Sequence, residues 1–192
     1  TRFEEWKDKN NKNHYKANSQ SLGKLLLLAR RLCENGCNFV TVTTSFVWDM
    51  HADVNNLGME RGMDYVGSPF NHSVSALIED IEARGLQDDI LVVCTGEMGR
   101  TPKINDRGGR DHWGNLTPLL LYGAGIPRGQ VIGHSTSDGG EPQSTPVTSP
   151  NLISTIMHTL VDVPELRLRV DVPRELMSVI GDHRPIDGLD LD

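Results

Sequence analysis

Residues 90–94, Ile90-Leu91-Val92-Val93-Cys94, are the stretch that decides the fold, because they are apolar throughout and are bounded by Asp88-Asp89 and Gly96. A short run in which every position is apolar is typical of a strand covered on both faces, as in a parallel sheet. A second such run, 119–122, follows after a polar loop. A third segment, 39–43, is rich in aromatic and β-branched residues, which favour strands. The sequence therefore predicts three strands.

Segments with apolar residues at helical spacing alternate with these strands, and each has a recognisable start or stop. They are 19–33, which begins at Ser19 or Ser21 and which Asn35-Gly36 ends; 68–84, which begins Ser68-Pro69 and stops before Gly85; and 149–160, which begins Ser149-Pro150. This order predicts an α/β fold in which helices cover a mostly parallel sheet. We expect one domain over residues 1–192, with 1–18 as either a solvated arm or a helix whose partner lies elsewhere. Residues 161–192 should be an irregular tail, apart from a short helix near 175–179.

The composition limits the classes of partner. The chain has 192 residues, of which 37% are hydrophobic and 23% charged, so it can bury a core. Lys and Arg number 19 against 26 for Asp and Glu, a net charge of −7, which argues against a nucleic-acid partner. No apolar stretch approaches the roughly 20 residues of a membrane span. Since the chain begins at Thr1 without an initiator Met, we expect it to be a processed product or part of a longer protein.

Polar side chains gather next to the predicted strands. In an open α/β sheet, ligands bind beyond the carboxyl ends of the strands, where loops carry the functional groups. Asp49 and His51 follow the first strand, Glu97 and Arg100 follow the second, and residues 110–112 stand just ahead of the third. We therefore expect these loops to form one site.

Asp49 and His51 are candidate ligands of a metal ion. Two residues apart, they point the same way if the segment is extended, and a carboxylate with an imidazole is a common ligand pair for zinc, manganese or iron. On spacing alone, the commoner outcome is that Asp49 caps a turn and His51 lies on the surface. Trp48, directly before the pair, is expected to pack against the fold.

The loop Gly96-Glu97-Met98-Gly99-Arg100-Thr101-Pro102 carries the next candidates. At the end of a strand, Glu97 can bind a metal or act as a general base, and Arg100 can hold an oxyanion through two parallel hydrogen bonds. The alternative, of equal weight on chemistry alone, is that Glu97 and Arg100 pair with each other, because structural ion pairs also gather in such loops.

A third loop, Gly108-Gly109-Arg110-Asp111-His112-Trp113-Gly114, packs polar groups between glycines. His112 is a candidate metal ligand, and Asp111 either binds the metal beside it or orients it. Arg110 would supply positive charge for an anionic substrate. The alternative is a surface loop that Asp111 caps.

These three motifs together resemble a known family. Residues 48–51, 96–102 and 109–113, in this order and at these intervals, are similar to the bacterial domain-of-unknown-function 1501 family. The resemblance continues through Gly123-Ala124-Gly125-Ile126, through Pro146-Val147-Thr148 and through the helix that holds Ile156-Met157-His158. It covers most of the chain from about residue 22 onward.

That family looks like a branch of the alkaline phosphatase and sulfatase superfamily. The resemblance implies a three-layer α/β/α sandwich, incomplete here at its N-terminus, and a hydrolase that attacks phosphate or sulfate esters with a divalent metal: zinc, manganese or calcium. It also implies an anionic small-molecule or polysaccharide ester as substrate and a periplasmic or extracellular location. The nucleophile would lie upstream of this chain, which would be the C-terminal part of the enzyme.

The resemblance also places the ligands. Asp49, His51 and His112 are similar to the superfamily's Asp and His ligands, and Glu97 to the carboxylate that ends the next strand. There the superfamily has adjacent Asp and His, whereas Met98 takes the second place here. The ligand atoms of these four residues should converge within about 5 Å of one point.

Around that point, Arg100, Arg110 and Asp111 are the residues we expect to act on the substrate. The alternative function is a degenerate, non-catalytic member of the same fold that binds a ligand or a partner.

Overall fold

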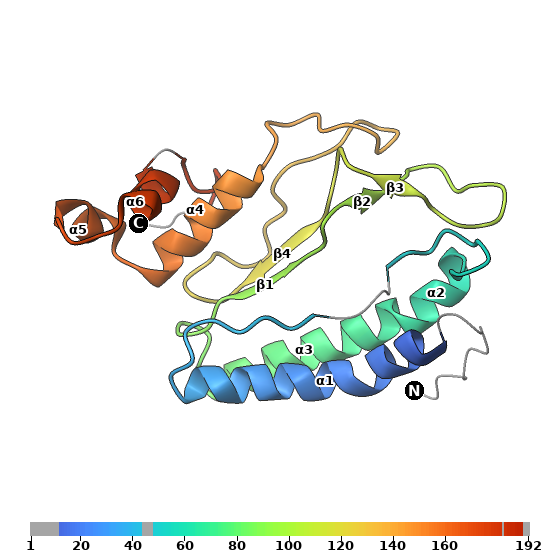
Figure 1. The fold of residues 1–192 in the computed structure, drawn as a ribbon, viewed down its shortest axis with the longest axis horizontal. Helices are drawn as coiled ribbons and strands as arrows, with labels where there is room; N and C mark the ends of the chain where they lie inside the picture. Colours follow the sequence, from blue (N-terminus) through green and yellow to red (C-terminus); the bar gives the residue numbers. More distant parts are fainter. Residues whose placement is uncertain (1–11, 44–47, 182, 190–192) are drawn as a thin grey trace. The chain divides into compact units, whose positions relative to one another are not determined.

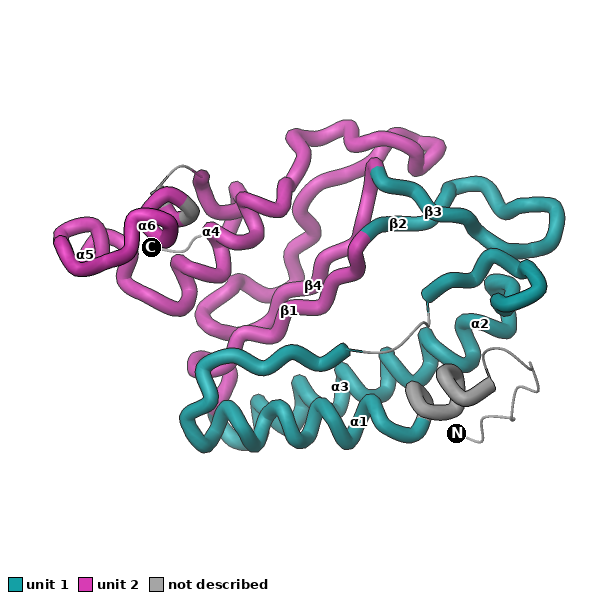
Figure 2. The backbone as a smooth tube through the Cα atoms, in the orientation of Figure 1, with its two compact units in different colours: residues 1–85, 98–114 teal, residues 86–97, 115–192 magenta. Residues whose placement is uncertain are grey.

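The computed structural model describes residues 12–43, 48–181 and 183–189. The chain forms two compact units, each built from two segments: residues 1–85 and 98–114 make the first, and 86–97 and 115–192 the second (Figure 2). The first unit contains α1 (Lys12–Glu34), α2 (Met59–Tyr65), α3 (Gly67–Ala83), β2 (Gly99–Arg100) and β3 (His112–Trp113). The second contains β1 (Val92–Thr95), β4 (Leu119–Tyr122), α4 (Ser149–Leu160), α5 (Val163–Leu168) and α6 (Arg174–Gly181). The single domain expected over residues 1–192 stays a prediction.

Helices α1 and α3 lie side by side and run in the same direction (Figure 1). Arg30 Nε lies 2.8 Å from Asp80 Oδ2, and Arg84 Nη1 lies 3.6 Å from Glu34 Oε1. The two partners are the same number of residues apart in both pairs, as expected for two helices that run in the same direction. Arg30 is only 4% exposed, so the ion pair with Asp80 belongs to the packed interface between the helices.

The end of α1 is where the sequence predicted it. Gly36 has φ +87°, and the N–H groups of Gly36 and Cys37 donate to the carbonyls of Cys33 and Leu32, which closes the helix in a Schellman motif. The helix starts earlier than the predicted Ser19 or Ser21, at Lys12, so residues 12–18 form a helix, which was one of the two alternatives for this segment. Residues 1–11 of that segment lie outside the described residues.

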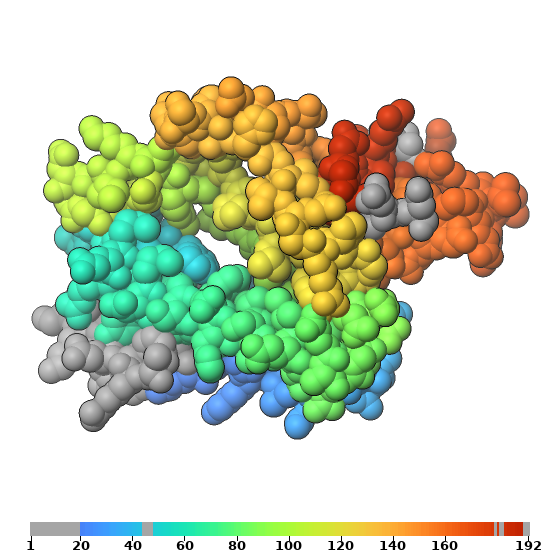
Figure 3. Space-filling view, turned by 180° about the vertical axis from the view of Figure 1, so that it is seen from behind, coloured from blue at the N-terminus to red at the C-terminus, as the bar shows by residue number. Residues whose placement is uncertain are grey.

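The predicted helix over 68–84 is confirmed as α3, and its buried residues include Val74 and Ile81. Ser68, however, does not cap it. Helix α2 leads almost directly into α3, so Val66 occupies the N-cap position and Ser68 lies inside the first turn. In the space-filling view, the residues of α2 and α3, cyan to green, form one continuous surface (Figure 3).

Two of the three predicted strands are present, and they pair with each other. Strand β1 is antiparallel to β4, with Val92 opposite Tyr122 and Thr95 opposite Leu119. This pair is antiparallel, and the mostly parallel sheet stays a prediction. A parallel pair needs a crossover connection, usually a helix, and the chain between β1 and β4 holds no helix. The described residues contain two two-stranded antiparallel sheets, β1–β4 and β2–β3; the three-layer sandwich stays a prediction.

The strand expected at 39–43 does not form. This segment has no regular secondary structure, and Phe39 is 74% exposed. Strand propensity acts through packing and pairing with a neighbouring strand, and no strand of the described chain pairs with these residues. Aromatic and β-branched composition alone was therefore an insufficient signal.

The C-terminal part is more helical than predicted. Helix α4 begins where expected, with Asn151 Oδ1 accepting hydrogen bonds from both N–H and Oγ1 of Thr148. Beyond it, α6 covers the short helix predicted near 175–179, whereas α5 forms where we expected an irregular tail. Asp162 caps α5 by accepting a hydrogen bond of 2.9 Å from the Glu165 N–H, and Pro164 lies in the first turn, which proline favours. No described helix is both long and apolar enough to span a bilayer.

Candidate metal centre

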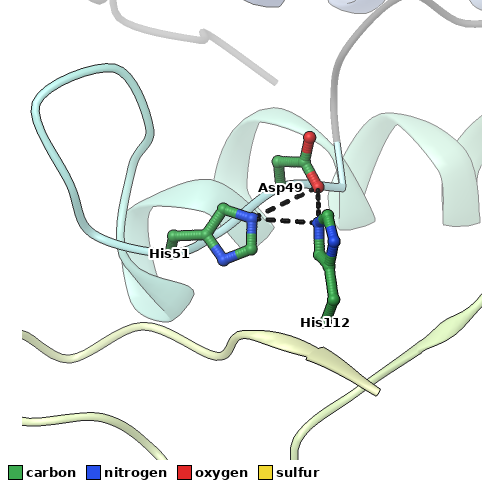
Figure 4. Close-up of side chains that lie close together, drawn as sticks. All are labelled: Asp49, His51 and His112. Carbon is green, nitrogen blue, oxygen red and sulfur yellow. Dashed lines mark hydrogen bonds and ion pairs between the residues drawn. The ribbon is translucent and has the colours of Figure 1, made fainter. Parts of the chain in front are cut away.

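The segment that carries Asp49 and His51 is anchored by the residue between them. Met50 is 2% exposed and packs in the core of the first unit. The other residues of this core cluster are Leu57, Tyr65 and Val66, with Met59 packed against it. Because neighbouring side chains in a non-helical segment point to different sides, burying Met50 leaves Asp49 and His51 together on the other side (Figure 4).

Two further contacts hold this segment in place. The Trp48 ring meets the Phe70 ring edge-on, with centroids 5.8 Å apart and planes at 81°, so Trp48 packs against α3 as predicted. Gly62 in α2 passes so close to Met50 that a Cβ there would lie 2.7 Å from Met50 Cγ. Glycine at this position therefore gives the Met50 side chain its space.

His112 and Arg100 come from the β2–β3 hairpin, where they lie directly opposite each other. The hairpin is extended by two hydrogen bonds beyond the ladder. The Thr101 N–H donates to the Asp111 carbonyl at 2.8 Å, and the Asp111 N–H donates to Thr101 Oγ1 at 3.0 Å. Cross-strand neighbours lie within about 5.5 Å of each other, so the ladder brings a cation and an imidazole to one place.

Backbone contacts join the hairpin loop to the segment that carries Asp49 and His51. The Arg110 N–H donates to the Met50 carbonyl at 2.9 Å, and the Met59 N–H donates to the Gly108 carbonyl at 3.0 Å. Gly109 lies between these two bonds. A Cβ on Gly109 would be 2.2 Å from the His51 carbonyl carbon, so only glycine permits this approach.

Asp49, His51 and His112 meet at one point, with one ligand atom of each within 4.8 Å of the others (Figure 4). His112 Nε2 lies 3.0 Å from Asp49 Oδ1 and 3.1 Å from His51 Nε2, and His51 Nε2 lies 3.5 Å from Asp49 Oδ1. We call these three residues the Asp-His-His cluster. Their ligand atoms form a nearly equilateral triangle of two imidazole nitrogens and one carboxylate oxygen.

Hydrogen bonds alone satisfy this triangle poorly. His51 Nδ1 lies 3.3 Å from Asp111 Oδ1, a contact that a proton on Nδ1 would satisfy because a carboxylate accepts hydrogen bonds. His51 Nε2 then presents a lone pair to the cluster. Among the three ligand atoms only His112 Nε2 would then supply a proton, so one proton would serve three contacts, while Arg100 Nη2 approaches Asp49 Oδ1 from outside the triangle. Three converging lone-pair atoms are the arrangement that a cation satisfies.

Arg100 and Asp111 flank the Asp-His-His cluster. Arg100 Nη2 lies 3.0 Å from Asp49 Oδ1, in a side chain that is 18% exposed. The side chains of His112 and Asp111 are about half exposed, at 51% and 52%. The protein therefore covers the cluster on the side of Arg100, whereas the side of His112 is open to solvent.

Asp53, which follows the cluster along the chain, has a purely local role. Burial raises the pKa of its carboxyl, but hydrogen bonds from the N–H groups of Asn55 and Asn56 more than offset this, so the pKa lies below its usual value. These bonds close the turn that follows His51, in which Ala52 has a left-handed φ of +55°.

The structure brings together three of the four predicted ligands. His51 is largely buried, and the Asp49 carboxylate contacts His112 and Arg100, so the alternative of a turn cap with a surface histidine is wrong. Glu97 belongs to the second unit, and its place as a fourth ligand stays a prediction. Arg110 is also placed differently: its guanidinium donates to the carbonyls of Thr101 and Pro102 and so braces the hairpin loop.

Sequence reasoning missed Asn105, which lies at the centre of the hairpin loop. Its Nδ2 donates to the His51 carbonyl at 3.0 Å and to Asp111 Oδ1 at 3.3 Å. The run Asn105-Asp106-Arg107-Gly108 has turn composition, with asparagine at the first position and Gly108 at φ +86°. That signal predicts the turn but not the contact with His51.

The comparison with known proteins agrees with the motifs. The sequence profile of the family described as "Protein of unknown function (DUF1501)" matches residues 4–188. No curated protein and no solved structure matches the chain. Since the match spans nearly the whole sequence and includes every residue of the Asp-His-His cluster, the chain belongs to the DUF1501 family.

Proposed function

We propose that Asp49, His51 and His112 bind one divalent transition-metal ion, and that the chain is the C-terminal part of a metal-dependent hydrolase of phosphate or sulfate esters. The observation that carries the proposal is the triangle of ligand atoms with sides of 3.0, 3.1 and 3.5 Å. Ligands 2.0–2.2 Å from a metal are about 3.4 Å apart at tetrahedral angles and about 3.0 Å apart at right angles. The triangle therefore fits three bonds to one ion.

The donor set favours particular metals. Two imidazole nitrogens and one carboxylate oxygen suit zinc, manganese or iron. Calcium takes six to eight oxygen ligands, so the two histidines count against the calcium that the family resemblance also allowed. We therefore propose zinc or manganese, with Asp111 holding His51 so that Nε2 faces the ion.

Three protein ligands leave coordination positions open, as in catalytic sites. When bound, a divalent ion polarises an ester oxygen or generates a hydroxide nucleophile from water. The carboxylates of Asp49 and Asp111 and the guanidinium of Arg100 sum to a formal charge of −1, which the ion would change to +1. A site of that charge attracts an anionic ester, and His112 lies on its exposed side.

The reaction class rests on the resemblance to the alkaline phosphatase and sulfatase superfamily, and within it the chain departs from the usual pattern. Met98 stands where the superfamily has its second ligand, and Glu97 belongs to the second unit. We therefore propose a single ion rather than a pair. Arg100 holds the Asp49 carboxylate in place by pairing with Oδ1.

Elemental analysis tests the metal proposal. The purified protein should carry close to one zinc or manganese per chain after dialysis, and both Asp49→Ala and His112→Ala should carry less than about a tenth of that, because two ligands cannot hold the ion against dialysis. His72→Ala, which removes an exposed histidine on α3 of the same unit, is the matched control and should keep the metal.

Turnover tests the reaction class. The longer protein that contains this chain should hydrolyse aryl phosphates or aryl sulfates, and chelation should abolish the activity. Metal binding without any turnover would instead support the non-catalytic ligand-binding alternative. A wild-type protein that binds no zinc or manganese would contradict the metal centre itself.

A further inference from the structure

We infer that Asn105 is a positioning residue of the metal centre, acting on His51 through Asp111. The inference rests on the proposed function for its metal readout, but the contacts that carry it are independent of any ion. Asn105 is not one of the three ligands of the Asp-His-His cluster. It contacts the main chain of one ligand and the side chain that orients that same ligand.

The amide of Asn105 uses all of its hydrogen-bonding capacity. Its Nδ2 donates to the His51 carbonyl and to Asp111 Oδ1, at 3.0 and 3.3 Å. Its Oδ1 accepts from the N–H groups of Gly109 and Arg107, at 3.0 and 3.1 Å. Two donors and two lone pairs are therefore matched to two acceptors and two donors. This fixes the orientation of the amide, because the reverse orientation would face oxygen with oxygen and N–H with N–H.

Through these contacts Asn105 joins the two segments that form the cluster. The hairpin loop supplies Asp111, and the segment after Trp48 supplies His51, so one side chain sets the distance between His51 and Asp111. That distance decides which nitrogen of His51 carries the proton. With Asp111 Oδ1 3.3 Å from Nδ1, the proton lies on Nδ1, and Nε2 is left to bind a metal.

Asn105→Asp is the sharpest variant, since it changes the shape of the side chain very little. It replaces a donor with an acceptor, so the new carboxylate would face the His51 carbonyl and the Asp111 carboxylate. Like charges in contact repel, and we expect Asp111 to move away from His51. The His51 ring then loses its acceptor at Nδ1 and shifts toward the Nε2–H tautomer. Asn105→Ala removes the bonds without repulsion and should have a smaller effect of the same kind.

The test uses two readouts on the full chain. Nitrogen-15 chemical shifts of the His51 ring, recorded without metal, report the tautomer. Zinc affinity, measured by competition with a chromophoric chelator, should fall about 10- to 100-fold in Asn105→Asp, the range typical when a group that orients a ligand is lost, and less in Asn105→Ala. Asp111→Asn should change the same two readouts.

Asn151→Asp is the matched control. Asn151 also bridges two segments: its Nδ2 donates to the Arg184 carbonyl at 3.0 Å, and its Oδ1 accepts from the Thr148 N–H at 2.9 Å. It lies in the second unit, so its substitution should lower stability while leaving the His51 tautomer and zinc affinity unchanged. This separates positioning from a general loss of stability.

The outcomes distinguish the two proposals. If the wild-type chain binds no metal but Asn105→Asp still shifts the His51 tautomer, Asn105 positions His51 and only the metal proposal fails. If the wild type binds zinc and the folded Asn105 variants keep both the Nδ1–H tautomer and full affinity, the role assigned to Asn105 is wrong.

Discussion

At the scale of single residues, Gly109 decides whether the two segments of the cluster can meet. The hairpin loop and the segment that carries His51 approach backbone to backbone there, closer than any side chain permits. Gly108, next to it, and Gly114, at the end of the hairpin, have open space where a Cβ would stand. The glycines of this hairpin are therefore not equivalent. Of these three, only Gly109 must be glycine because another stretch of backbone approaches it closely.

Gly109→Ala should accordingly separate the hairpin loop from His51. A Cβ 2.2 Å from the His51 carbonyl carbon forces the backbone to move, and we expect a loss of about 1–3 kcal/mol in the free energy of unfolding, as for other overpacked sites. Zinc binding should be lost with it. Urea denaturation and elemental analysis measure the two effects. Gly114→Ala, on the same hairpin, should change neither; equal effects of the two substitutions would contradict the close-approach argument.

At the scale of elements, the helix pair α1–α3 depends on ionised Asp80. The hydrogen bond from Arg84 Nε, at 2.8 Å, and then the charge of Arg30 hold the pKa of the Asp80 carboxyl below its usual value. A carboxyl with a lowered pKa in the folded state stabilises the fold at all pH values above its unfolded pKa of about 3.9, and that contribution is lost as the pH falls through the folded pKa.

Asp80→Asn should therefore make the stability of the protein less sensitive to acid. Between about pH 4 and pH 2, the melting temperature of the wild type should fall more steeply than that of the variant, whereas at pH 7 the wild type should be the more stable of the two. Thermal unfolding monitored by circular dichroism over this pH range measures both. Glu79→Gln, at an exposed position of the same helix, should follow the wild type; parallel curves for Asp80→Asn and wild type would refute the role of Asp80.

The elements also show where sequence patterns are sufficient. Helices α3 and α4 and strands β1 and β4 follow from local signals, because apolar spacing, a terminal proline or glycine and an apolar run each act within a few residues. Strand pairing was not predictable in this way. The antiparallel partner of β1 depends on how the chain returns from β1 to β4, and the segment 39–43 lacks the partner that its composition led us to expect.

At the scale of the whole molecule, the proposed metal should stabilise one unit more than the other, since all three ligands lie in the first unit. At a free metal concentration of about a hundred times the dissociation constant, binding adds about 2.7 kcal/mol to the stability of the folded form. Chelation removes that contribution. The ion would tie the hairpin to the segment that carries Asp49 and His51, so local opening between these segments should become rarer.

Hydrogen exchange measures this directly. Chelation should speed exchange at the amides of Arg110 and Met59, whose hydrogen bonds join the two segments, and should leave the amide of Ile186 in the second unit unchanged. Faster exchange throughout the chain would show that the ion acts on both units together. Unchanged exchange at Arg110 and Met59 would contradict a metal that bridges the two segments.

The sequence by itself determined the helices α3 and α4, the two longer strands, the family and three ligands of the candidate centre, because each depends on residue types at fixed local spacing. Only the tertiary structure decided that Arg110 braces a loop, and that Asn105 and Gly109 contact the main chain of His51. These outcomes depend on distances between segments about 60 residues apart in the chain, such as Asp49 and His112, and no local pattern encodes such a distance.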